Sequence, residues 1–489
     1  MKVAIVGAGQ AGIILARALV GPGKHITLID SGNFYSESEL INKSSYDLQT
    51  NSRMPEGVHR VGGGANLWYG RVSQFPDYVF DNKFYGWPIS AEEIRPYYLE
   101  LYKILKLGEM TDKDFCKIHL QRIQDLLLGQ FEISPFFNCE PDYFQEMLSE
   151  LKNSKNVSIK LDSPVKSINV SNTDEKFLEF FDGSLEPYDK IVISAGALQS
   201  TAILIRSIDR LPLMKNIESV GTRLMEHYDG YIGTLKIRKW RLQDFELMVS
   251  GSKSNSVSIS GDIRSFGFGI KLPRQLYLDS NLKFLDFHLC FEPYQEIYTF
   301  GDLYYLIPRG TNIKRAFFRI ERIIRKLLII PTRKLLDFCF GVVRFSVYMK
   351  GEEAPFIEST LTLTNSPTNY LGILIYNHRI SRQTTRRIRV SLREFKRRFQ
   401  DLGFGKIKLF WWFMNNPGSA YAGPNWHPMG TIPMHLDPSI SVVNPDLSLV
   451  NYPDIYMLNS GIYPSGSYQN PTATTLALAL RLSKTLYQP

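Results

Sequence analysis

The sequence contains few cysteines. Its four cysteines, Cys116, Cys139, Cys290 and Cys339, are scattered without a CxxC pair or a regular spacing. Neither a disulfide framework nor a zinc site is indicated, so no metal ligands are assigned. We therefore expect a protein that is kept in a reducing compartment.

The sequence also lacks a secretory signal and a membrane-spanning run. The opening MKVAIVGAG enters an apolar strand at once, without the basic start, apolar core and cleavage site of a signal peptide. The apolar stretch LLDFCFGVVRFSVYM carries Asp337 and Arg344 and is too short to cross a bilayer. We expect a cytoplasmic protein.

What is present is an ordinary globular composition, with 44% hydrophobic and 13% aromatic residues. A chain of 489 residues is longer than one compact core supports. We expect two or three domains, with enough material to enclose a large cofactor.

Basic residues outnumber acidic ones by nine, and the excess is concentrated. From Arg309 to Lys334 there are nine basic residues and one acid, Glu321. Such a segment within residues 309–349 suits peripheral contact with an anionic membrane, and a helix packed on its own domain with solvated arginines is the alternative. No base-reading motif accompanies the charge, so we expect no nucleic-acid binding. The spacing predicts one apolar helical face (Ile320, Ile323, Ile324, Leu327 and Leu328) and one basic face (Arg315, Arg319, Arg322 and Lys326).

The amino-terminal unit is the best defined. An apolar strand, VAIVG, runs into the turn GAGQAG, then a helix, then the strand HITLID. Gly7 permits the tight turn, Gly9 lets the backbone approach a pyrophosphate, and Gly12 lets the helix pack closely on the strand. Asp30 can bind ribose hydroxyls and disfavours NADP, which leaves FAD and NAD open. The alternative is a glycine-rich turn with a surface aspartate.

A second glycine loop follows at RVGGGANLWYGR. Gly62, Gly63 and Gly64 suit a backbone packed against a flat ring or phosphates, where side chains would obstruct. A flexible linker is the alternative, but the flanking residues are too apolar for one. Further on, Ser90 and Glu93 form a capping box that predicts an amphipathic helix.

The middle of the chain predicts two kinds of sheet. Residues 157–207 show a strand, the turn Ala195-Gly196-Ala197 and a helix, which would return to the first sheet and make the nucleotide domain discontinuous. Residues 228–300 mix aromatic and β-branched residues in short alternating runs, as antiparallel strands do. A basic helix around residues 385–402 is interpreted as having a solvated face.

The last seventy residues carry the candidate chemistry. Asn470 followed by Pro471 predicts a helix from about Pro471 to about Leu486, whose amino end suits an electron-rich group. His427, in NWHPMGT, is the candidate proton acceptor, with a buried structural histidine as the alternative. His227 and His435 are interpreted as structural.

These landmarks resemble the glucose-methanol-choline (GMC) oxidoreductases, which are FAD-dependent. The matching pieces are GAGQAG, GGGANLW, GWPIS, SAGALQSTAILIRS, VGTRLMEH, HPMGT and YPSGSYQNPTATTLALALRL. The resemblance implies an α/β fold in which a Rossmann-like FAD-binding domain adjoins an antiparallel-sheet substrate domain. It implies that His427 accepts the alcohol proton as hydride passes to flavin N5, while Asn470 binds the substrate oxygen. It assigns the cofactor site to Gly7, Gly9, Gly12, Asp30, Gly63, Gly64, Asn66, Val165, Ala195, Gly461, Pro471 and Thr472.

Two departures from the family pattern shape the expectations. Asn459, in LNSGIYP, stands where the family often has an aspartate, so we expect a different contact to the ribityl chain or phosphate of the flavin. Leu67 stands where members with covalent FAD have a histidine, so we expect FAD without a covalent bond. The tail is most similar to members acting on sugars.

The expected domains are a discontinuous FAD-binding domain (1–80, 155–226 and 418–489), a connecting helical region (81–154) and a substrate domain (227–417). The hypothesis is FAD-dependent oxidation of an alcohol on a sugar or sugar-containing metabolite. An NAD-dependent dehydrogenase and a non-catalytic membrane-surface scaffold are the alternatives. The sequence leaves the alcohol and the electron acceptor open.

Overall fold

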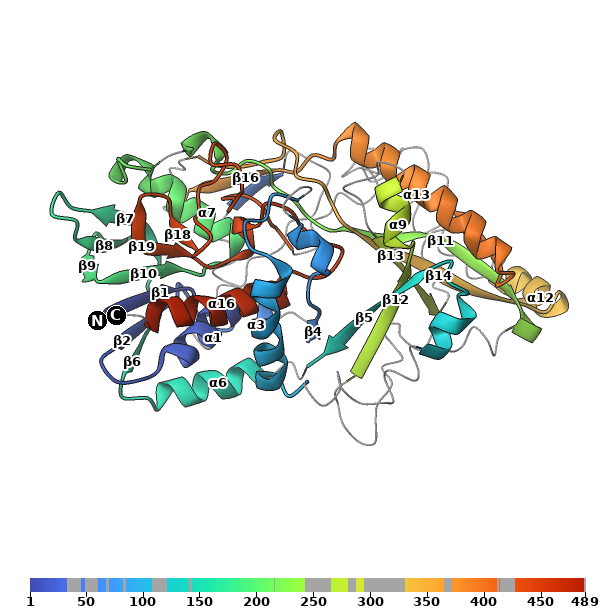
Figure 1. The fold of residues 1–489 in the computed structure, drawn as a ribbon, viewed down its shortest axis with the longest axis horizontal. Coiled ribbons are helices and arrows are strands. Elements are labelled where there is room, and N and C mark those ends of the chain that lie inside the picture. The colour runs from blue at the N-terminus through green and yellow to red at the C-terminus, as the bar shows by residue number, and fades with distance from the viewer. Residues whose placement is uncertain are drawn as a thin grey trace.

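Two sheets of different type dominate the computed structural model, and Figure 1 shows them side by side. A mainly parallel sheet lies at the end that holds both termini, and an antiparallel sheet extends to the opposite end. The structure describes residues 1–32, 45–48, 60–66, 70–81, 85–107, 121–139, 143–214, 216–241, 265–279, 287–293, 330–364, 372–410, 413 and 427–487.

The mainly parallel sheet has six strands in the order β18-β19-β10-β1-β2-β6. All neighbouring pairs are parallel except β18 with β19. Its central strands are short runs of valine and isoleucine, as expected for strands covered on both faces. The strands are β1 (Lys2–Val6), β2 (His25–Ile29), β6 (Val157–Lys160), β10 (Lys190–Ile193), β18 (Ser448–Leu449) and β19 (Tyr452–Met457).

Helices cover this sheet. The helix α1 (Gln10–Leu19) follows the first glycine turn and packs against α16 (Thr472–Tyr487), which in turn packs against α3 (Ala91–Ile104). The helix α7 (Gly196–Ser207) follows β10, and α6 (Tyr143–Lys152) lies against α1. Segments from both ends of the chain therefore share one core.

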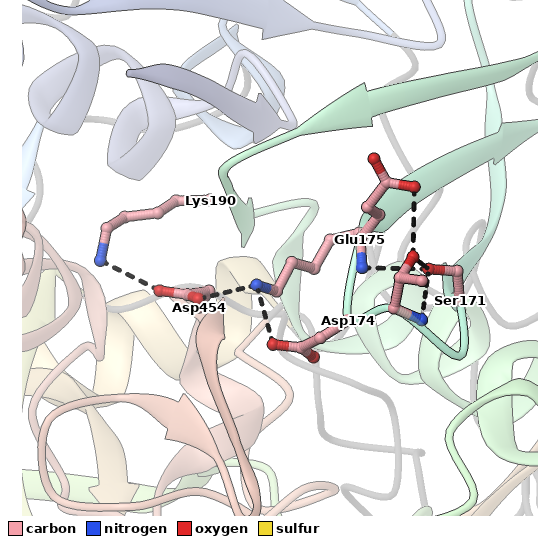
Figure 2. Close-up of polar contacts among 7 residues, drawn as sticks. Ser171, Asp174, Glu175, Lys190 and Asp454 are labelled. Carbon is pink, nitrogen blue, oxygen red and sulfur yellow. Dashed lines mark hydrogen bonds and ion pairs between the residues drawn. The ribbon is translucent and has the colours of Figure 1, made fainter.

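A small antiparallel sheet of β7 (Val165–Val170), β8 (Lys176–Phe180) and β9 (Leu185–Tyr188) is tied to the parallel sheet by ion pairs. Asp454 of β19 lies 2.9 Å from Lys176 Nζ and 3.2 Å from Lys190 Nζ. Figure 2 shows Asp454 with Lys190 on one side of its carboxylate. Lys176 also contacts Asp174 in the β7–β8 turn.

The antiparallel sheet has seven strands in the order β17-β11-β14-β13-β12-β5-β4. One face is apolar and packs under α13 (Arg382–Asp401), whose Phe395 and Phe399 are fully buried. The other face carries polar side chains such as Lys350, His288 and Ser134, because alternate residues of a strand point to opposite faces. The strands are β17 (Lys406–Leu409), β11 (Tyr228–Arg238), β14 (Val342–Gly351), β13 (Phe287–Pro293), β12 (Ser265–Lys271), β5 (Glu132–Asn138) and β4 (Arg71–Val72).

The remaining elements are short. A fourth, mixed sheet joins β15 (Thr360–Thr364), β16 (Ile373–Asn377) and β3 (Ser45–Leu48). The helices α9 (Arg274–Asp279) and α12 (Ile330–Cys339) lie beside the seven-stranded sheet in Figure 1. The 3-10 turns are η2 (Gly63–Asn66), η3 (Asp77–Phe80), η4 (Ile208–Arg210), η5 (Ile217–Ser219), η6 (Lys239–Arg241) and η9 (Ser460–Ile462).

The predicted fold class is confirmed, since parallel and antiparallel sheets with helices stand as expected. Ser90 caps α3 by accepting a bond from Glu93 N at 3.2 Å, but Glu93 pairs with Arg481, so only half of the predicted capping box forms. The predicted basic helix at 315–328 lies outside the described residues. The domain boundaries stay predictions.

Among the described residues, the helices are all too short or too polar to cross a membrane.

Candidate active site

The first glycine turn lies at the carboxyl end of β1, between the ends of β2 and β10. At Gly7, with φ of +107°, a Cβ atom would lie 2.6 Å from Ser194 O. At Gly12 it would lie 2.0 Å from Gly7 O, so both positions need glycine. At Gly9 a Cβ atom would meet nothing within 4 Å, which leaves free space above the amino end of α1. Phosphates fit such a helix end, because its first amide groups have no partners within the helix.

Asp30 follows β2 and faces this turn. Its Oδ2 accepts a bond from Ala8 N and its Oδ1 accepts one from Gly32 N, both at 2.8 Å. Burial raises the pKa of the carboxyl; the two amide bonds oppose this rise, and the charge of Asp162 adds to it. Each carboxylate oxygen retains a second lone pair for a ribose hydroxyl.

Val165 lies close to Asp30 because the preceding segment runs alongside it. Ser163 N donates to Asp30 O at 2.9 Å, and Asp162 N donates to Gly32 O at 3.2 Å. Val165 is buried, so it supplies an apolar wall rather than a polar contact.

The second glycine loop is joined directly to the first. Gly62 N donates to Ala8 O at 2.7 Å, and at Gly63 a Cβ atom would come within 3.3 Å of Gly9 Cα. Asn66 Nδ2 donates to Val61 O at 3.1 Å and to Gly63 O at 3.0 Å, which fixes the turn η2. At Gly64 a side chain would meet nothing within 4 Å. Leu67, on which the expectation of non-covalent FAD rests, lies outside the described residues.

The ends of β10 and β19 complete this side of the site. Ala195 leads from β10 into α7, and Leu458 N donates to Ile193 O at 2.9 Å. The Oδ1 of Asn459 accepts a bond from Gly461 N at 2.8 Å, so this buried amide caps η9. Gly461 O in turn accepts a bond from Ile432 N at 2.8 Å, which joins the turn to the HPMGT segment.

The terminal helix begins within one residue of the prediction. Thr472 is its first residue, and Pro471 O accepts bonds from Thr475 N at 2.9 Å and from Tyr463 Oη at 3.1 Å. The Oδ1 of Asn470 accepts a hydrogen bond from Lys350 Nζ of β14. Asn470 therefore reaches the antiparallel sheet, a contact that its predicted capping role did not indicate.

His427 lies in a cluster of imidazole rings and cations. Its ring centroid is 4.7 Å from that of His227, and its Nδ1 has no hydrogen-bond partner among the residues that the structure describes. Burial, then the positive charges of Lys350 and Arg71, hold the pKa of His427 well below 6.5. The imidazole is therefore neutral at physiological pH, as a proton acceptor must be.

Two further histidines share this environment. Burial, then Lys350 and His427, lower the pKa of His227, while hydrogen bonds of its ring to the backbone of residues 467 and 469 oppose the shift. Burial, then Lys350, Arg71 and Lys271, lower the pKa of His288. Lys350 therefore influences all three rings.

A network of buried acids and their partners, which we call the acid network, binds the main chain of His427. Glu226 Oε2 accepts a bond from His427 N at 3.1 Å, and Glu226 Oε1 accepts one from Tyr376 Oη at 3.0 Å. Glu226 N donates to Glu353 Oε2 at 2.9 Å, and this oxygen also pairs with His378 Nε2 at 2.7 Å.

Two groups of the acid network, Glu226 and His378, have raised pKa values. Burial raises the pKa of Glu226 to about 7, although His378, Tyr376 and the His427 amide oppose this, and the charge of Glu353 adds to it. Burial would lower the pKa of His378, but the charge and hydrogen bond of Glu353 raise it overall.

Sequence reasoning missed Lys350 and the acid network. Lys350 lies in MKGEEAP, whose charges are typical of a surface turn, and only the register of β14 with β13 turns it inward. His227 was interpreted as structural, yet its ring lies against His427. His435 Nδ1 accepts a bond from Asp437 N at 2.9 Å, in keeping with a structural role.

Comparisons with known proteins agree with this geometry. Residues 355–479, which include His427 and Asn470, match the GMC oxidoreductase family model. The fold is similar to pyridoxine 4-oxidase from Mesorbium loti, with a TM-score of 0.60 and 16% identity over 100% of this chain and 99% of that one. A formate oxidase variant from Aspergillus oryzae RIB40 gives a TM-score of 0.57 and 14% identity, covering 99% and 97%. No curated protein matches the sequence.

Proposed function

We propose that the chain is an FAD-dependent oxidoreductase that oxidises an alcohol on a sugar or sugar-containing metabolite, and the match of residues 355–479 to the GMC oxidoreductase family model supports this. The observation that carries the proposal is the buried ring of His427, which lies 4.7 Å from that of His227 and whose Nδ1 has no partner among the described residues. The location that we propose is the cytoplasm.

The described residues fit the cofactor. The free space at Gly9 and Gly64, the amino end of α1 and the lone pairs of Asp30 suit the pyrophosphate and ribose of FAD. When bound, FAD supplies the acceptor for the hydride that leaves the alcohol carbon. We propose that it is held without a covalent bond.

His427 takes the hydroxyl proton. Its neutral form is favoured by burial and by the charges of Lys350 and Arg71. The same charges disfavour the imidazolium that forms, so the proton is passed on readily after the reaction. General base catalysis of this kind contributes roughly 10²–10⁴-fold.

Asn470 orients the substrate oxygen. A lysine ammonium can only donate, so the contact with Lys350 requires the side-chain oxygen of Asn470 to face Lys350. This leaves the amide nitrogen as the donor for the alcohol oxygen. Lys350 therefore sets which end of the amide meets the substrate.

Glu226 is a positioning residue. It does not face the alcohol, but it bonds the main-chain N–H of His427 while Tyr376 and Glu353 hold it in turn. A base must stay within hydrogen-bond reach of the proton it abstracts, so this fixed backbone matters for the rate.

A sugar is favoured by the polar face of the antiparallel sheet near the base. His288 Nδ1 lies 3.3 Å from Ser134 Oγ, and Gln469 Nε2 donates to the same oxygen at 2.8 Å. Neutral hydrogen-bonding groups of this kind suit several hydroxyls in one substrate.

The test is anaerobic flavin reduction by a panel of free, glycosylated and lipid-linked sugars. Purified protein should show flavin absorbance, and acid precipitation should release the flavin. His427→Ala should keep the bound flavin but slow its reduction by roughly 10²–10⁴-fold. The control His25→Ala, at an exposed histidine of β2, should change neither property.

Each outcome of these experiments tests a different part of the proposed function. A colourless protein that FAD does not restore would support the scaffold alternative. Oxidation of the alcohol with formation of NADH from NAD, in protein that contains no flavin, would support an NAD-dependent dehydrogenase. Bound flavin that is reduced equally fast in His427→Ala would remove His427 from its role, and reduction only by alcohols that are not sugars would remove the substrate class.

A further inference from the structure

Large apolar side chains are exposed at the end of the molecule that lies farthest from the termini. They belong to α12, to the turn after it and to η6, and we call this group the apolar tip. Figure 1 shows α12 at that end of the antiparallel sheet. The exposed fractions are 63% for Leu335, 49% for Leu336, 79% for Phe338, 68% for Phe340 and 75% for Trp240.

The acidic residue of α12, Asp337, points toward the antiparallel sheet. Asp337 pairs with Arg344 of β14, with 2.6 Å between Oδ1 and Nη2, and both side chains are largely buried. Since successive helical residues are about 100° apart, Leu335 lies about 160° and Phe338 about 100° around the helix from Asp337, and both are exposed to solvent. The ion pair therefore holds the apolar side of α12 outward.

Trp240 joins this surface through the ends of two strands. Arg238 of β11 is paired with Val342 of β14, and Lys239 N donates to Gly341 O at 2.7 Å. Because Phe340 precedes Gly341 and Trp240 follows Lys239, the two rings lie on adjoining turns. The apolar tip is thus one surface built from two segments distant in sequence.

Basic side chains border the apolar tip. Lys236, Arg238 and Lys239 are exposed at the end of β11, and Lys406 and Lys408 are exposed on the neighbouring β17. Lys236 is the register partner of Lys406, so these strands present their charges side by side. Asp337, the acid of α12, is already neutralised by Arg344.

We propose that the apolar tip docks on an anionic lipid surface. Tryptophan, phenylalanine and leucine enter the headgroup boundary, while lysine and arginine beside them bind anionic headgroups. Among the residues that the structure describes, the acids near the apolar tip are paired, Asp337 with Arg344 and Asp401 with Arg397, which leaves an excess of lysine and arginine. This excess matches an anionic lipid surface better than a protein partner, whose rim would carry both signs of charge. The proposal does not depend on the proposed oxidation.

The experiment is vesicle co-sedimentation of the flavin-loaded full chain. Wild-type protein should sediment with vesicles of phosphatidylcholine mixed with phosphatidylglycerol, and weakly with phosphatidylcholine alone. The variant Trp240→Ser/Phe338→Ser/Phe340→Ser should lose this binding. Arg238→Gln and Lys239→Gln should each weaken it roughly fivefold, and added salt should weaken the wild type.

The matched control is Leu99→Ser/Leu213→Ser, at exposed leucines of the other half of the molecule. It should bind vesicles like the wild type. All variants should keep the flavin spectrum and turn over a water-soluble alcohol normally, which separates lipid binding from folding and from catalysis. The fluorescence of Trp240, read as the difference from Trp240→Phe, should shift to the blue on binding.

The proposal is overturned if wild type ignores anionic vesicles, or if the triple variant and the control bind them equally. A concentration-dependent dimer that the triple variant abolishes, without vesicle binding, would assign the apolar tip to a second copy of the chain instead.

Discussion

The two large sheets build their halves of the site by different means. The parallel sheet offers backbone: glycines at the ends of its strands leave free space and exposed amides, and few ionisable side chains take part. The antiparallel sheet offers side chains, because Lys350, His288 and Ser134 lie on one face, and the charge of Lys350 acts on the candidate base His427. A cofactor shared by many enzymes can be held by main chain, whereas a particular substrate must be met by side chains.

Their packing differs for the same reason. The parallel sheet is covered on both faces and its strands are mainly apolar, and the charges that it does carry, such as those of Lys190 and Asp454, are paired. The antiparallel sheet buries one face under α13 and can therefore devote the other to polar groups. Its polar face carries the buried His288, and the buried Glu226 belongs to the acid network behind His427.

The largest effect is expected where the side-chain half meets His427. Glu226→Leu removes the acceptor for two buried donors, His427 N and Tyr376 Oη. Each donor left unpaired costs about 1–3 kcal/mol, so unfolding should become easier by roughly 2–6 kcal/mol. Denaturant unfolding measures this loss, and the rate of flavin reduction should fall with it.

Two further variants separate positioning from stability. Glu226→Gln keeps one acceptor oxygen, so it should recover part of the stability and of the rate. Glu179→Leu removes a buried acid bound to Lys166 and Ser167, far from His427 in the fold, and should lower stability alone. If both leucine variants slow flavin reduction equally, Glu226 has no special role.

A smaller effect is expected at the glycine turn, where two alanine variants separate folding from binding. Gly12→Ala places a methyl group against Gly7 O and should destabilise the protein by about 1–3 kcal/mol, even without FAD. Gly9→Ala enters free space, so the apoprotein should melt normally while FAD binding weakens. Thermal unfolding and FAD titration measure both. Equal behaviour of the two variants would contradict the backbone account of this half.

The smallest effect is a pH dependence that arises in the side-chain half. The folded pKa values of His227, His288 and His427 lie below 6.5, so the unfolded chain binds more protons below that pH. Stability from these rings is present above pH 6.5 and is lost as pH falls below it.

The acid network has the opposite sign. The raised pKa of Glu226, at about 7, means that the folded state binds more protons than the unfolded chain between pH 4.5 and 7. Its contribution therefore falls as pH rises through that range, and that of His378 falls as pH rises past its own raised pKa. The melting temperature measured against pH should decline below 6.5, and His288→Asn should reduce this decline. A decline of full size in that variant would place the titrating groups elsewhere.

Local signals in the sequence were enough to predict those elements whose structure depends on a single segment of the chain. The spacing of Gly7, Gly9 and Gly12 after an apolar strand predicted the turn, because those steric needs are local. Ser381 and the apolar period of α13 fix a helix close to the expected 385–402, since a cap and a buried stripe act within one segment. The start of the terminal helix was predictable for the same reason, because the signal of Asn470 followed by Pro471 is local.

Contacts across the chain were not predictable in this way. The sequence by itself determined the fold class and the two candidate residues His427 and Asn470, because the motif around His427 and the helix-start signal at Asn470 each consist of neighbouring residues. Only the tertiary structure decided that Lys350 bonds Asn470, that His227 lies against His427 and that Glu226 holds its main chain. These pairs are set by strand register and by the packing of distant segments, and a side chain's pKa depends on neighbours that its own segment does not contain.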